Sequence, residues 1–278
     1  MELSKFFSVS KHSLDNLKTS TLWFSSPHDF NDPFEGRVAV KKVYSQDTFA
    51  SRREVEEIVN INQDYFHDKN REFHDHLVSL ATLEEKIEFI FNVWGHTLRT
   101  LHMDYIAEDG YCCFCRRDRT FAKNQLMWSH YANGLRGFCL VFDKVTLHQS
   151  LQTLNQQDTL IIEPVEYRNA LPEIDIHQHM THHFKPSELL GDLVAEFIIK
   201  SRSTKSRAWR HEREYRAISS STGLHSYAPE AVRKILIGEK MPQAQRRKIE
   251  AIARTVYSGA HIEHVRLDKD SYQLKIVL

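Results

Sequence analysis

Short apolar runs open the chain and predict strands at residues 3–9 and 21–25. Between these runs, Leu14 and Leu17 suit one turn of a helix, because residues three apart lie on the same helical face. We therefore expect the chain to begin with a compact strand, helix and strand.

The hydrophobic pattern becomes helical from about residue 50 to residue 108. Thr82 and Glu85 have the spacing of a capping box, in which two side chains satisfy the first free N–H groups of a helix. They are followed, at three- and four-residue steps, by Ile87, Ile90, Phe91, Trp94 and Leu98. This spacing predicts a helix with one buried face, whose aromatic residues belong to the core rather than to a cofactor site.

The rest of the chain alternates between strand-like and helix-like hydrophobic patterns. Strands are predicted at 110–115, within 137–143, at 213–219 and 233–238, and in two alternating runs near the end of the chain. Helices are predicted at 125–131, 185–201 and 242–257. Because the long helices are grouped in the middle and the strands lie towards both ends, the pattern favours an α+β fold with a mixed or antiparallel sheet. We expect one domain over residues 1–278, with a helical insertion at about 50–108.

Charge and composition limit the classes of binding partner that the sequence favours. Acidic and basic residues number 37 each, so no overall field favours nucleic acid or an anionic membrane. An apolar stretch of about 18 residues and a secretion signal are both absent from the sequence. We therefore expect a cytoplasmic protein without a membrane partner. The sequence does not predict an oligomeric state.

The four cysteines point to packing rather than to metal or disulfide chemistry. Cys112, Cys113 and Cys115 form a C-C-x-C run, and Cys139 follows later. A zinc site would need a second ligand pair at a suitable spacing. Buried strand thiols are the favoured interpretation, and no metal is expected.

Common catalytic signatures are missing: there is no glycine-rich phosphate loop, no H-E-x-x-H and no G-x-S-x-G. One polar stretch nevertheless stands out near the start, "LWFSSPHDFNDPFEG", from Leu22 to Gly36. Asn31 and Asp32 precede Pro33, so they suit a turn or a helix cap. Capping alone would explain them, and a place at the edge of a site is the alternative. Phe30 and Phe34 are expected to anchor the loop to the core.

A second stretch, "MWSHYANG", places Trp128, His130 and Tyr131 on one short helix that ends before Gly134. Such residues are packed in many proteins, and they are also suitable side chains for binding or catalysis. Both interpretations stay open on the sequence alone.

The third stretch, "WRHEREYRAI", carries two glutamates. In an alternating strand Glu212, Glu214 and Arg216 would share one face. Two carboxylates on one face repel each other unless cations, a ligand or a shifted pKa compensates. The surrounding basic residues are Lys200, Arg202, Lys205, Arg207, Arg210, Arg213 and Arg216. They would form a phosphate-attracting patch, or else solvated charges with a few ion pairs.

A histidine-rich segment lies at 177–183. His179, His182 and His183 would fall within one helical turn, a spacing that metal sites use. No carboxylate or cysteine supports them in the adjoining sequence, so the role of this segment stays open.

Taken together, the motifs F-N-D-P-F-E, M-W-S-H-Y-A and W-x-x-E-x-E-Y-R resemble the bacterial family catalogued as domain of unknown function 2971. That resemblance spans nearly the whole chain and implies no chemistry. More distantly, the opening strand–helix–strand and the ending "PEAVRKILIG" are similar to DNA-targeting ADP-ribosyltransferase toxins. Glu212 and Glu214 also match the E-x-E spacing of arginine-directed ADP-ribosyltransferases.

The second resemblance implies an ADP-ribosyltransferase fold, NAD as a candidate substrate, and a defence or toxin role. Glu214 would be the catalytic carboxylate and Glu212 would act on the acceptor, a protein or a nucleic acid. Of the remaining residues, Tyr131 and His130 are the nearest candidates for the central motif. The binding candidates are Trp128 or Tyr131 against nicotinamide, Asn31 and Asp32 at the rim, and Arg207, Arg210 or Arg216 on the pyrophosphate.

The sequence departs from these transferases in the first strand, where they usually carry an arginine or histidine and this chain has only Lys5. Two other functions therefore stay open. One is nucleic-acid binding, with the basic run beside Trp128 and Trp209 as stacking platforms. The other is a non-catalytic module that senses a ligand or binds a protein. The transferase hypothesis requires that Asn31, Tyr131 and Glu214 meet in one cleft.

Overall fold

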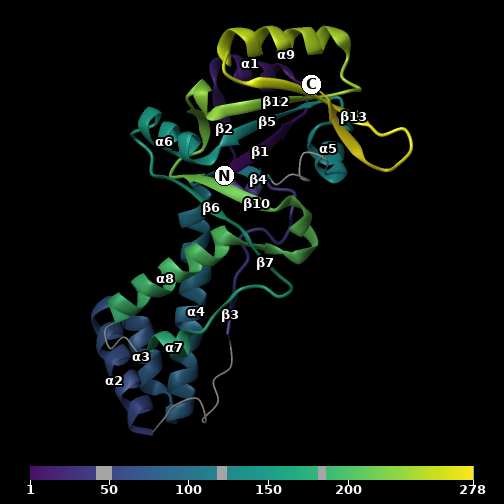
Figure 1. Cartoon of the computed structure of the whole chain (residues 1–278). Helices are drawn as coiled ribbons and strands as arrows, with labels where there is room; N and C mark the ends of the chain where they lie inside the picture. Colours follow the sequence, from purple (N-terminus) through teal and green to yellow (C-terminus); the bar gives the residue numbers. More distant parts are fainter. Residues whose placement is uncertain (42–51, 118–123, 181–185, 278) are drawn as a thin grey trace. The chain divides into compact units, whose positions relative to one another are not determined.

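The computed structural model describes residues 1–41, 52–117, 124–180 and 186–277 (Figure 1). The chain forms two compact units, each built from separate segments of the sequence. The first unit contains Met1–Pro33, Glu108–Tyr167 and Lys205–Leu278. The second contains Phe34–Ala107 and Arg168–Thr204.

An eight-stranded sheet forms the centre of the first unit. Its spatial order is β14-β13-β12-β5-β1-β4-β10-β6. The strands are β1 (Glu2–Phe7), β4 (Gly110–Arg116), β5 (Phe138–Asp143), β6 (Leu160–Pro164), β10 (Glu214–Ser219), β12 (Val232–Gly238), β13 (His261–Leu267) and β14 (Leu274–Val277). Neighbours are antiparallel except for the parallel pair β12 and β13. The mostly antiparallel α+β class predicted from the sequence is confirmed.

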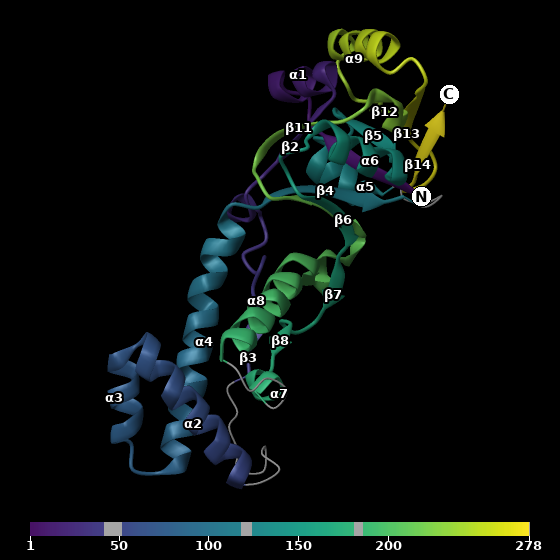
Figure 2. The same ribbon diagram turned by 90° about the vertical axis from the view of Figure 1, so that its left-hand side faces the viewer.

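Helices cover both faces of this sheet, as the alternation of its strands requires. Phe138, Leu140 and Phe142 of β5 join one core cluster, which also receives α1 (Lys11–Thr19), α6 (Lys144–Leu154) and α9 (Gln243–Val256). Cys139 and Val141 join a cluster on the other face, together with α5 (Gln125–Tyr131). Figure 2 shows α1 and α9 side by side above the sheet.

Short elements complete the first unit. Two strands, β2 (Thr21–Phe24) and β11 (Gly223–Ser226), form a separate antiparallel pair. Another pair is formed by β7 (Glu166–Arg168) and β9 (Thr204–Ser206). The 3₁₀ turns are η1 (Pro27–Asp29), η4 (Arg207–Glu212) and η5 (Pro229–Ala231). The predicted opening of strand, helix and strand is confirmed by β1, α1 and β2.

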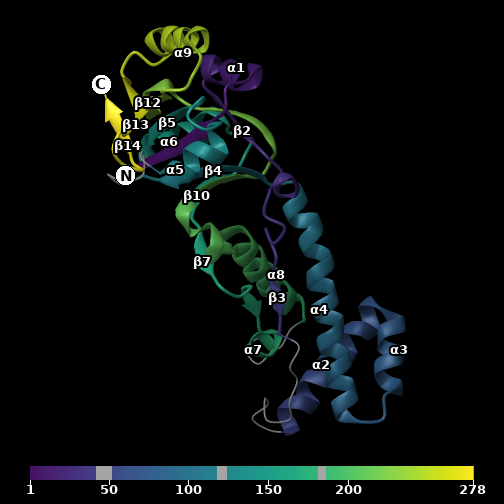
Figure 3. The ribbon, with the colours of Figure 1, turned by 90° about the vertical axis from the view of Figure 1, so that its right-hand side faces the viewer.

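The second unit is mainly helical (Figure 3). Its helices are α2 (Arg52–Lys69), α3 (Arg71–Ser79), α4 (Leu83–Ala107), α7 (Ile176–Met180) and α8 (Pro186–Ser203), with a short parallel pair, β3 (Ala39–Val40) and β8 (Glu173–Ile174). The predicted capping box is confirmed, because the Glu85 N–H donates to Thr82 Oγ1 at 3.1 Å and the Thr82 N–H donates to Glu85 Oε2 at 3.0 Å. Trp94 is buried as expected, and its indole N–H donates to Asn62 Oδ1 at 2.8 Å.

The helical insertion expected at about 50–108 corresponds to α2, α3 and α4. The unit that holds them also includes residues 168–204, which the sequence pattern had left in the main body. The reason is visible in α8, whose Leu189, Leu193 and Phe197 are buried in the same core cluster as Trp94. The description of the whole chain as one domain stays a prediction. Within the described residues, none of the helices has the length and apolar character needed to cross a bilayer.

Candidate functional site

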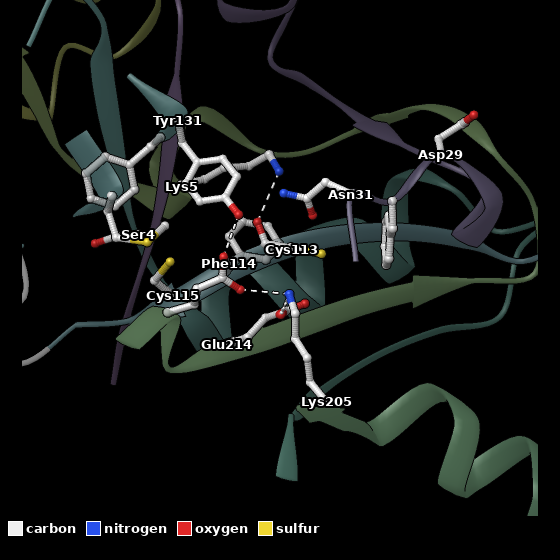
Figure 4. Close-up of a pocket in the computed structure, with 14 residues that line it drawn as sticks. Ser4, Lys5, Asp29, Asn31, Cys113, Phe114, Cys115, Tyr131, Lys205 and Glu214 are labelled. Carbon is white, nitrogen blue, oxygen red and sulfur yellow. Dashed lines mark hydrogen bonds and ion pairs between the residues drawn. The ribbon is translucent and has the colours of Figure 1, made fainter. Parts of the chain in front are cut away.

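A pocket of about 360 Å³ lies in the first unit, against β1, β4 and β10. Figure 4 shows its lining side chains and the contacts among them. They come from five places in the chain: Ser4, Lys5 and Phe6; Asp29, Phe30 and Asn31; Cys113, Phe114 and Cys115; Met127 and Tyr131; and Lys205, Glu212 and Glu214. The pocket is thus assembled from the sheet, the loop after η1, the helix α5 and the segment around η4.

A charged cluster forms one wall of the pocket. The Lys205 ammonium donates to Glu212 Oε2 at 2.7 Å and to Glu214 Oε2 at 2.8 Å. Arg216 Nε donates to Glu214 Oε1 at 2.8 Å. The Tyr131 hydroxyl donates to Glu212 Oε1 at 2.5 Å. Each glutamate therefore accepts one hydrogen bond on each of its two oxygens from these side chains.

The charged side chains of this cluster are buried. The side chains of Lys205, Glu212, Glu214 and Arg216 are 7%, 5%, 2% and 1% exposed. Burial by itself would raise the pKa of Glu214, but the Arg216 guanidinium and the Lys205 ammonium outweigh it and lower the pKa to about 2. Burial would likewise lower the pKa of Lys205, but the charges of Glu214 and Glu212 raise it. The sequence argument that two neighbouring carboxylates need compensating cations is confirmed.

The two glutamates meet by a different backbone route from the one predicted. Residues 207–212 form the 3₁₀ turn η4 rather than a strand, because Ser206 caps it by accepting from the Ala208 N–H at 3.4 Å. Arg213 then adopts a left-handed conformation, with φ of 47°, and β10 begins at Glu214. The predicted alternating strand through Glu212 is therefore wrong. The turn at Arg213 nevertheless directs both glutamates inward.

The helix α5 is fixed at its start and at its end. Asn124 is its N-cap, accepting from the Leu126 N–H at 3.1 Å, and its side-chain amide donates to the His211 carbonyl at 3.0 Å. The first contact begins the helix and the second ties it to η4. This placement brings Tyr131, the last residue of the helix, to Glu212. Burial and the hydrogen bond to Glu212 both raise the pKa of Tyr131, so its hydroxyl stays protonated.

A second cation lies across the pocket on the first strand. Lys5 Nζ donates to the Cys113 carbonyl at 3.0 Å, and it lies 5.6 Å from the centre of the Phe114 ring. Lys5 thus reaches the pocket from β1, the first strand of the chain.

The predicted buried strand thiols are confirmed for Cys112, Cys115 and Cys139, while Cys113 is partly exposed. All four are free. Burial raises the pKa of Cys113 and Cys115, the two that face the pocket, well above the usual range for thiols. A thiol with a raised pKa forms little thiolate, so both are poor nucleophiles.

The structure brings together Asn31, Tyr131 and Glu214, which the sequence analysis had placed in one cleft from three distant motifs, and Glu212 lies with them. His130, the other candidate for this cleft, is not among the lining residues. Asn31 comes from the loop after η1, Tyr131 from α5 and Glu214 from the start of β10. The predicted convergence of the three motifs is confirmed (Figure 4).

Several other candidates lie elsewhere. Trp128 is only 1% exposed and packs edge-on against Phe6 at 5.3 Å, so it belongs to the core and cannot stack on a ligand or a nucleic acid base. His130 is exposed, and Asp32 is buried outside the pocket lining. Trp128 is inward because α5 uses one face to cover the sheet, which leaves Tyr131 for the pocket.

The basic run behaves differently from the predicted patch. Arg207 and Arg210 are exposed on η4, outside the pocket lining. Lys205 and Arg216 are buried in ion pairs with the glutamates, so neither contributes to an exposed phosphate-attracting surface. Arg216 therefore holds Glu214 rather than standing free for a pyrophosphate, because the buried carboxylate is the nearer anion.

The loop from Leu22 to Gly36 is anchored by one phenylalanine rather than two. Phe30 packs edge-on against Tyr111 at 5.7 Å, and the Arg216 guanidinium lies 5.7 Å from the centre of its ring. Phe34 is 55% exposed, so its expected role as a buried anchor is wrong. The Arg37 guanidinium lies 5.5 Å from the centre of its ring.

The histidine-rich segment is only partly described. His179 bonds to Glu196, a carboxylate of α8 distant in the sequence. His182 and His183 lie outside the described residues. Within the described residues, no group of three or more histidine, cysteine or acidic side chains is arranged to hold a metal ion.

Sequence reasoning missed three lining residues that matter to the site. Lys205 had been counted only as part of a basic run, although two adjacent glutamates required a buried cation and Lys205 is the residue that supplies it to both. Lys5 had been noted only as a departure from the transferases. Phe30 had been assigned only to the core, and no signal in its short loop distinguishes an anchor from a pocket wall.

The fold and the site define an α+β protein with two buried glutamates, bridged by a lysine, in the wall of a pocket. Residues 127–217 match the model of a family described as "Protein of unknown function (DUF2971)", which confirms the family resemblance. The match contains the second and third motifs, and so includes Tyr131, Lys205, Glu212 and Glu214. Neither the curated proteins nor the solved structures contain a match to this chain.

Proposed function

We propose that the protein binds NAD in this pocket and breaks the bond between nicotinamide and ribose, passing ADP-ribose to water or to an acceptor. The observation that carries this proposal is the pair of glutamates in the pocket wall, fixed by Lys205 and Arg216 and reached by the hydroxyl of Tyr131.

Breaking this bond leaves a ribose with oxocarbenium character, and a carboxylate near the ribose stabilises the developing positive charge. Glu214 suits that role because its two cationic partners hold it in position and keep it ionised. Stabilisation by a group that is already oriented needs no reorganisation during the reaction. Glu212, which the E-x-E resemblance assigns to the acceptor, lines the same pocket, and its Oε1 accepts from the Tyr131 hydroxyl.

The remaining lining residues support recognition of a nucleotide. Phe30 and Tyr131 are partly exposed aromatic side chains and replace Trp128 as candidates to contact the nicotinamide ring. The amide of Asn31 and the ammonium of Lys5 offer polar contacts to the carboxamide, the ribose or a phosphate. A volume of about 360 Å³ suits the nicotinamide riboside half of NAD, with the rest of the dinucleotide extending outside.

The test is nicotinamide release from NAD, followed by chromatography, for the wild type and for Glu214→Gln. We expect the substitution to lower turnover on the order of 100-fold or more, since it removes the negative charge and keeps the shape. It also leaves two buried cations facing a neutral amide, so each variant must first be shown to be folded by circular dichroism and thermal unfolding.

Two further variants keep the test decisive. Glu214→Asp retains the charge but withdraws it from the pocket, and we expect it to fold better than Glu214→Gln and still to release nicotinamide slowly. Glu263→Gln is the matched control, because Glu263 is a buried glutamate of β13 paired with Lys234 at 2.5 Å and lies outside the pocket lining. Wild-type protein that releases no nicotinamide, or a Glu214→Gln variant as active as Glu263→Gln, would exclude the proposal.

A binding module without turnover is the second candidate, and one observation favours it. Both oxygens of Glu214 already accept bonds from cations, which reduces the negative potential left for a cationic ribose. NAD binding in isothermal titration without nicotinamide release would support this function. A nucleic-acid platform is less well supported, because Trp128 and the basic residues Lys205 and Arg216 are buried.

A further inference from the structure

Among the described residues that line the pocket, none is placed to protonate a leaving group, although several are hydrogen-bond donors. Its described titratable lining residues are Lys5 of β1, Asp29 of η1, Cys113 and Cys115 of β4, Tyr131 of α5, Lys205 of β9, Glu212 of η4 and Glu214 of β10. Arg216 and Tyr167 contact Glu214 from outside the lining: Arg216 Nε donates to Glu214 Oε1, and the Glu214 N–H donates to the Tyr167 hydroxyl at 2.7 Å.

The carboxylates are not donors. Each oxygen of Glu212 and Glu214 accepts a hydrogen bond from a cation or from Tyr131. A protonated carboxyl would lose one of these bonds and leave Lys205 or Arg216 without its buried counter-charge. Asp29 is exposed, and its carboxyl points away from the cluster in Figure 4.

The groups that do carry protons are held more firmly than usual. The Tyr131 hydroxyl is committed to Glu212, and burial together with that bond raises its pKa. Lys205 donates to both carboxylates, whose charges raise its pKa above that of an ordinary lysine. The Lys5 ammonium donates to a carbonyl oxygen, a bond that favours the charged form. Burial keeps the thiols of Cys113 and Cys115 protonated.

We propose that this pocket cleaves only ribosides whose leaving group already carries a positive charge, and that Lys205 enforces this selectivity by pairing with both glutamates, so that neither serves as the acid. The inference rests on the proposed function and adds the class of substrate. It follows from the arrangement of the cluster, in which one buried ammonium bridges two carboxylates at 2.7 and 2.8 Å.

The electron count explains the selectivity. In a pyridinium riboside, the bond from C1′ to the ring nitrogen breaks and its electron pair passes to the nitrogen, which becomes neutral. The ribose becomes a cation, water adds through its oxygen to C1′, and one proton goes to solvent. A purine, or dihydronicotinamide, would leave as an anion unless a general acid protonated it, and such an acid contributes about 10²–10⁴-fold to a rate.

The test compares two pairs of substrates that differ at the leaving group. NAD and NADH share their ribose, pyrophosphate and adenosine, and nicotinamide mononucleotide and adenosine monophosphate share their ribose phosphate. We expect base release from NAD and from nicotinamide mononucleotide. Release from NADH and from adenosine monophosphate should be slower by more than about 100-fold. Inhibition of NAD cleavage by NADH confirms that NADH enters the pocket.

Lys205→Met provides an arm that does not depend on turnover. Lys275→Met is the control, at an ion pair whose lysine is 62% exposed. Glutamate side chains labelled with ¹³C at the carboxyl carbon are titrated by NMR. We expect one carboxyl of the pair to take up a proton at a higher pH in Lys205→Met than in the wild type, while Lys275→Met leaves the pair unchanged.

The outcomes separate the two proposals. If wild-type protein releases no base from any of the four substrates, the proposed function fails and this inference fails with it. If NADH or adenosine monophosphate is cleaved within about tenfold of NAD, the function stands and only the selectivity is overturned. An unchanged carboxyl titration in Lys205→Met overturns the role given to Lys205, whatever the activity.

Discussion

Replacing Lys205 with methionine should destabilise the protein far more than removing an ordinary surface lysine. Methionine keeps much of the side-chain length but removes the ammonium that bridges Glu212 and Glu214 at 2.7 and 2.8 Å. The lysine side chain is 7% exposed, so water cannot replace the lost charge. Two carboxylates would then face each other in the protein interior.

The size of the effect follows from burial. Removing one partner of a buried ion pair costs about 3–5 kcal/mol, because the other charge is left without compensation. The stacking of Lys205 on Trp209, at 5.1 Å from the ring centre, adds about 0.5–1 kcal/mol. The loss would be a large part of a total stability of about 5–15 kcal/mol. In thermal unfolding, it corresponds to a fall in Tm on the order of 10 °C.

Urea unfolding at pH 7, followed by circular dichroism, measures this loss. Lys275→Met is the control, because the Lys275 side chain is 62% exposed although that of its partner Asp268 is 9% exposed. Solvent reaches the lysine of this pair, and solvent-exposed pairs contribute about 0–1 kcal/mol. A double variant, Lys205→Met with Glu212→Gln, should recover part of the stability because it removes one of the two opposed charges. If Lys205→Met loses no more stability than Lys275→Met, the cluster is not the buried network described above.

Three further results are expected. The pKa of Glu214 is about 2 in the folded protein against an ordinary value of 4.5, so its ionised carboxylate contributes about 3 kcal/mol to the free energy of unfolding. This contribution is complete above pH 4.5 and is lost as the pH falls towards 2. Acid unfolding should show this loss of stability in the wild type and not in Glu214→Gln. Phe30→Ala should lower the free energy of unfolding by about 1–3 kcal/mol, whereas Phe34→Ala, at a side chain that is 55% exposed, should change it by less than about 0.5 kcal/mol. Equal losses of the two variants in urea unfolding would contradict the assignment of Phe30 as the anchor. Thr82→Ala should lower the free energy of unfolding by about 1 kcal/mol, because it removes the hydroxyl that accepts from the Glu85 N–H. A loss of helicity on heating that follows the same curve as in the wild type would contradict this prediction.

The fold was largely predictable because its signals are local. Three- and four-residue steps marked the helix that contains Trp94, and Thr82 with Glu85 marked its start. Alternation marked the strands, and the grouping of helices and strands gave the α+β class. What could not be predicted is that residues 168–204 pack with α2–α4, because that association depends on which apolar faces meet in space, and the sequence pattern does not encode their partners.

The site was predictable in its residues and less so in its geometry. Unsatisfied polar motifs singled out Asn31, Tyr131 and Glu214, which the structure brings to one pocket. The pattern for Glu212 failed, because a left-handed residue at Arg213 breaks the strand and only the backbone reveals it. The prediction that Trp128 contacts a ligand failed, because a short helix presents one face to the sheet and another to the pocket. Its sequence does not show which aromatic side chain lies on which face.

The division of the chain into two discontinuous units affects how the pocket can form during synthesis. The first unit takes its residues from three separated segments, and the last of them begins at Lys205. Lys5 and Asn31 leave the ribosome early, but the lysine and both glutamates that complete the pocket follow only after the entire second unit has been made. Contacts between such distant segments form slowly because the intervening chain must first be ordered. A ribosome paused before residue 205 would therefore carry the buried strands β1, β4 and β5 without β10, with an open hydrogen-bonding edge that a chaperone would need to protect.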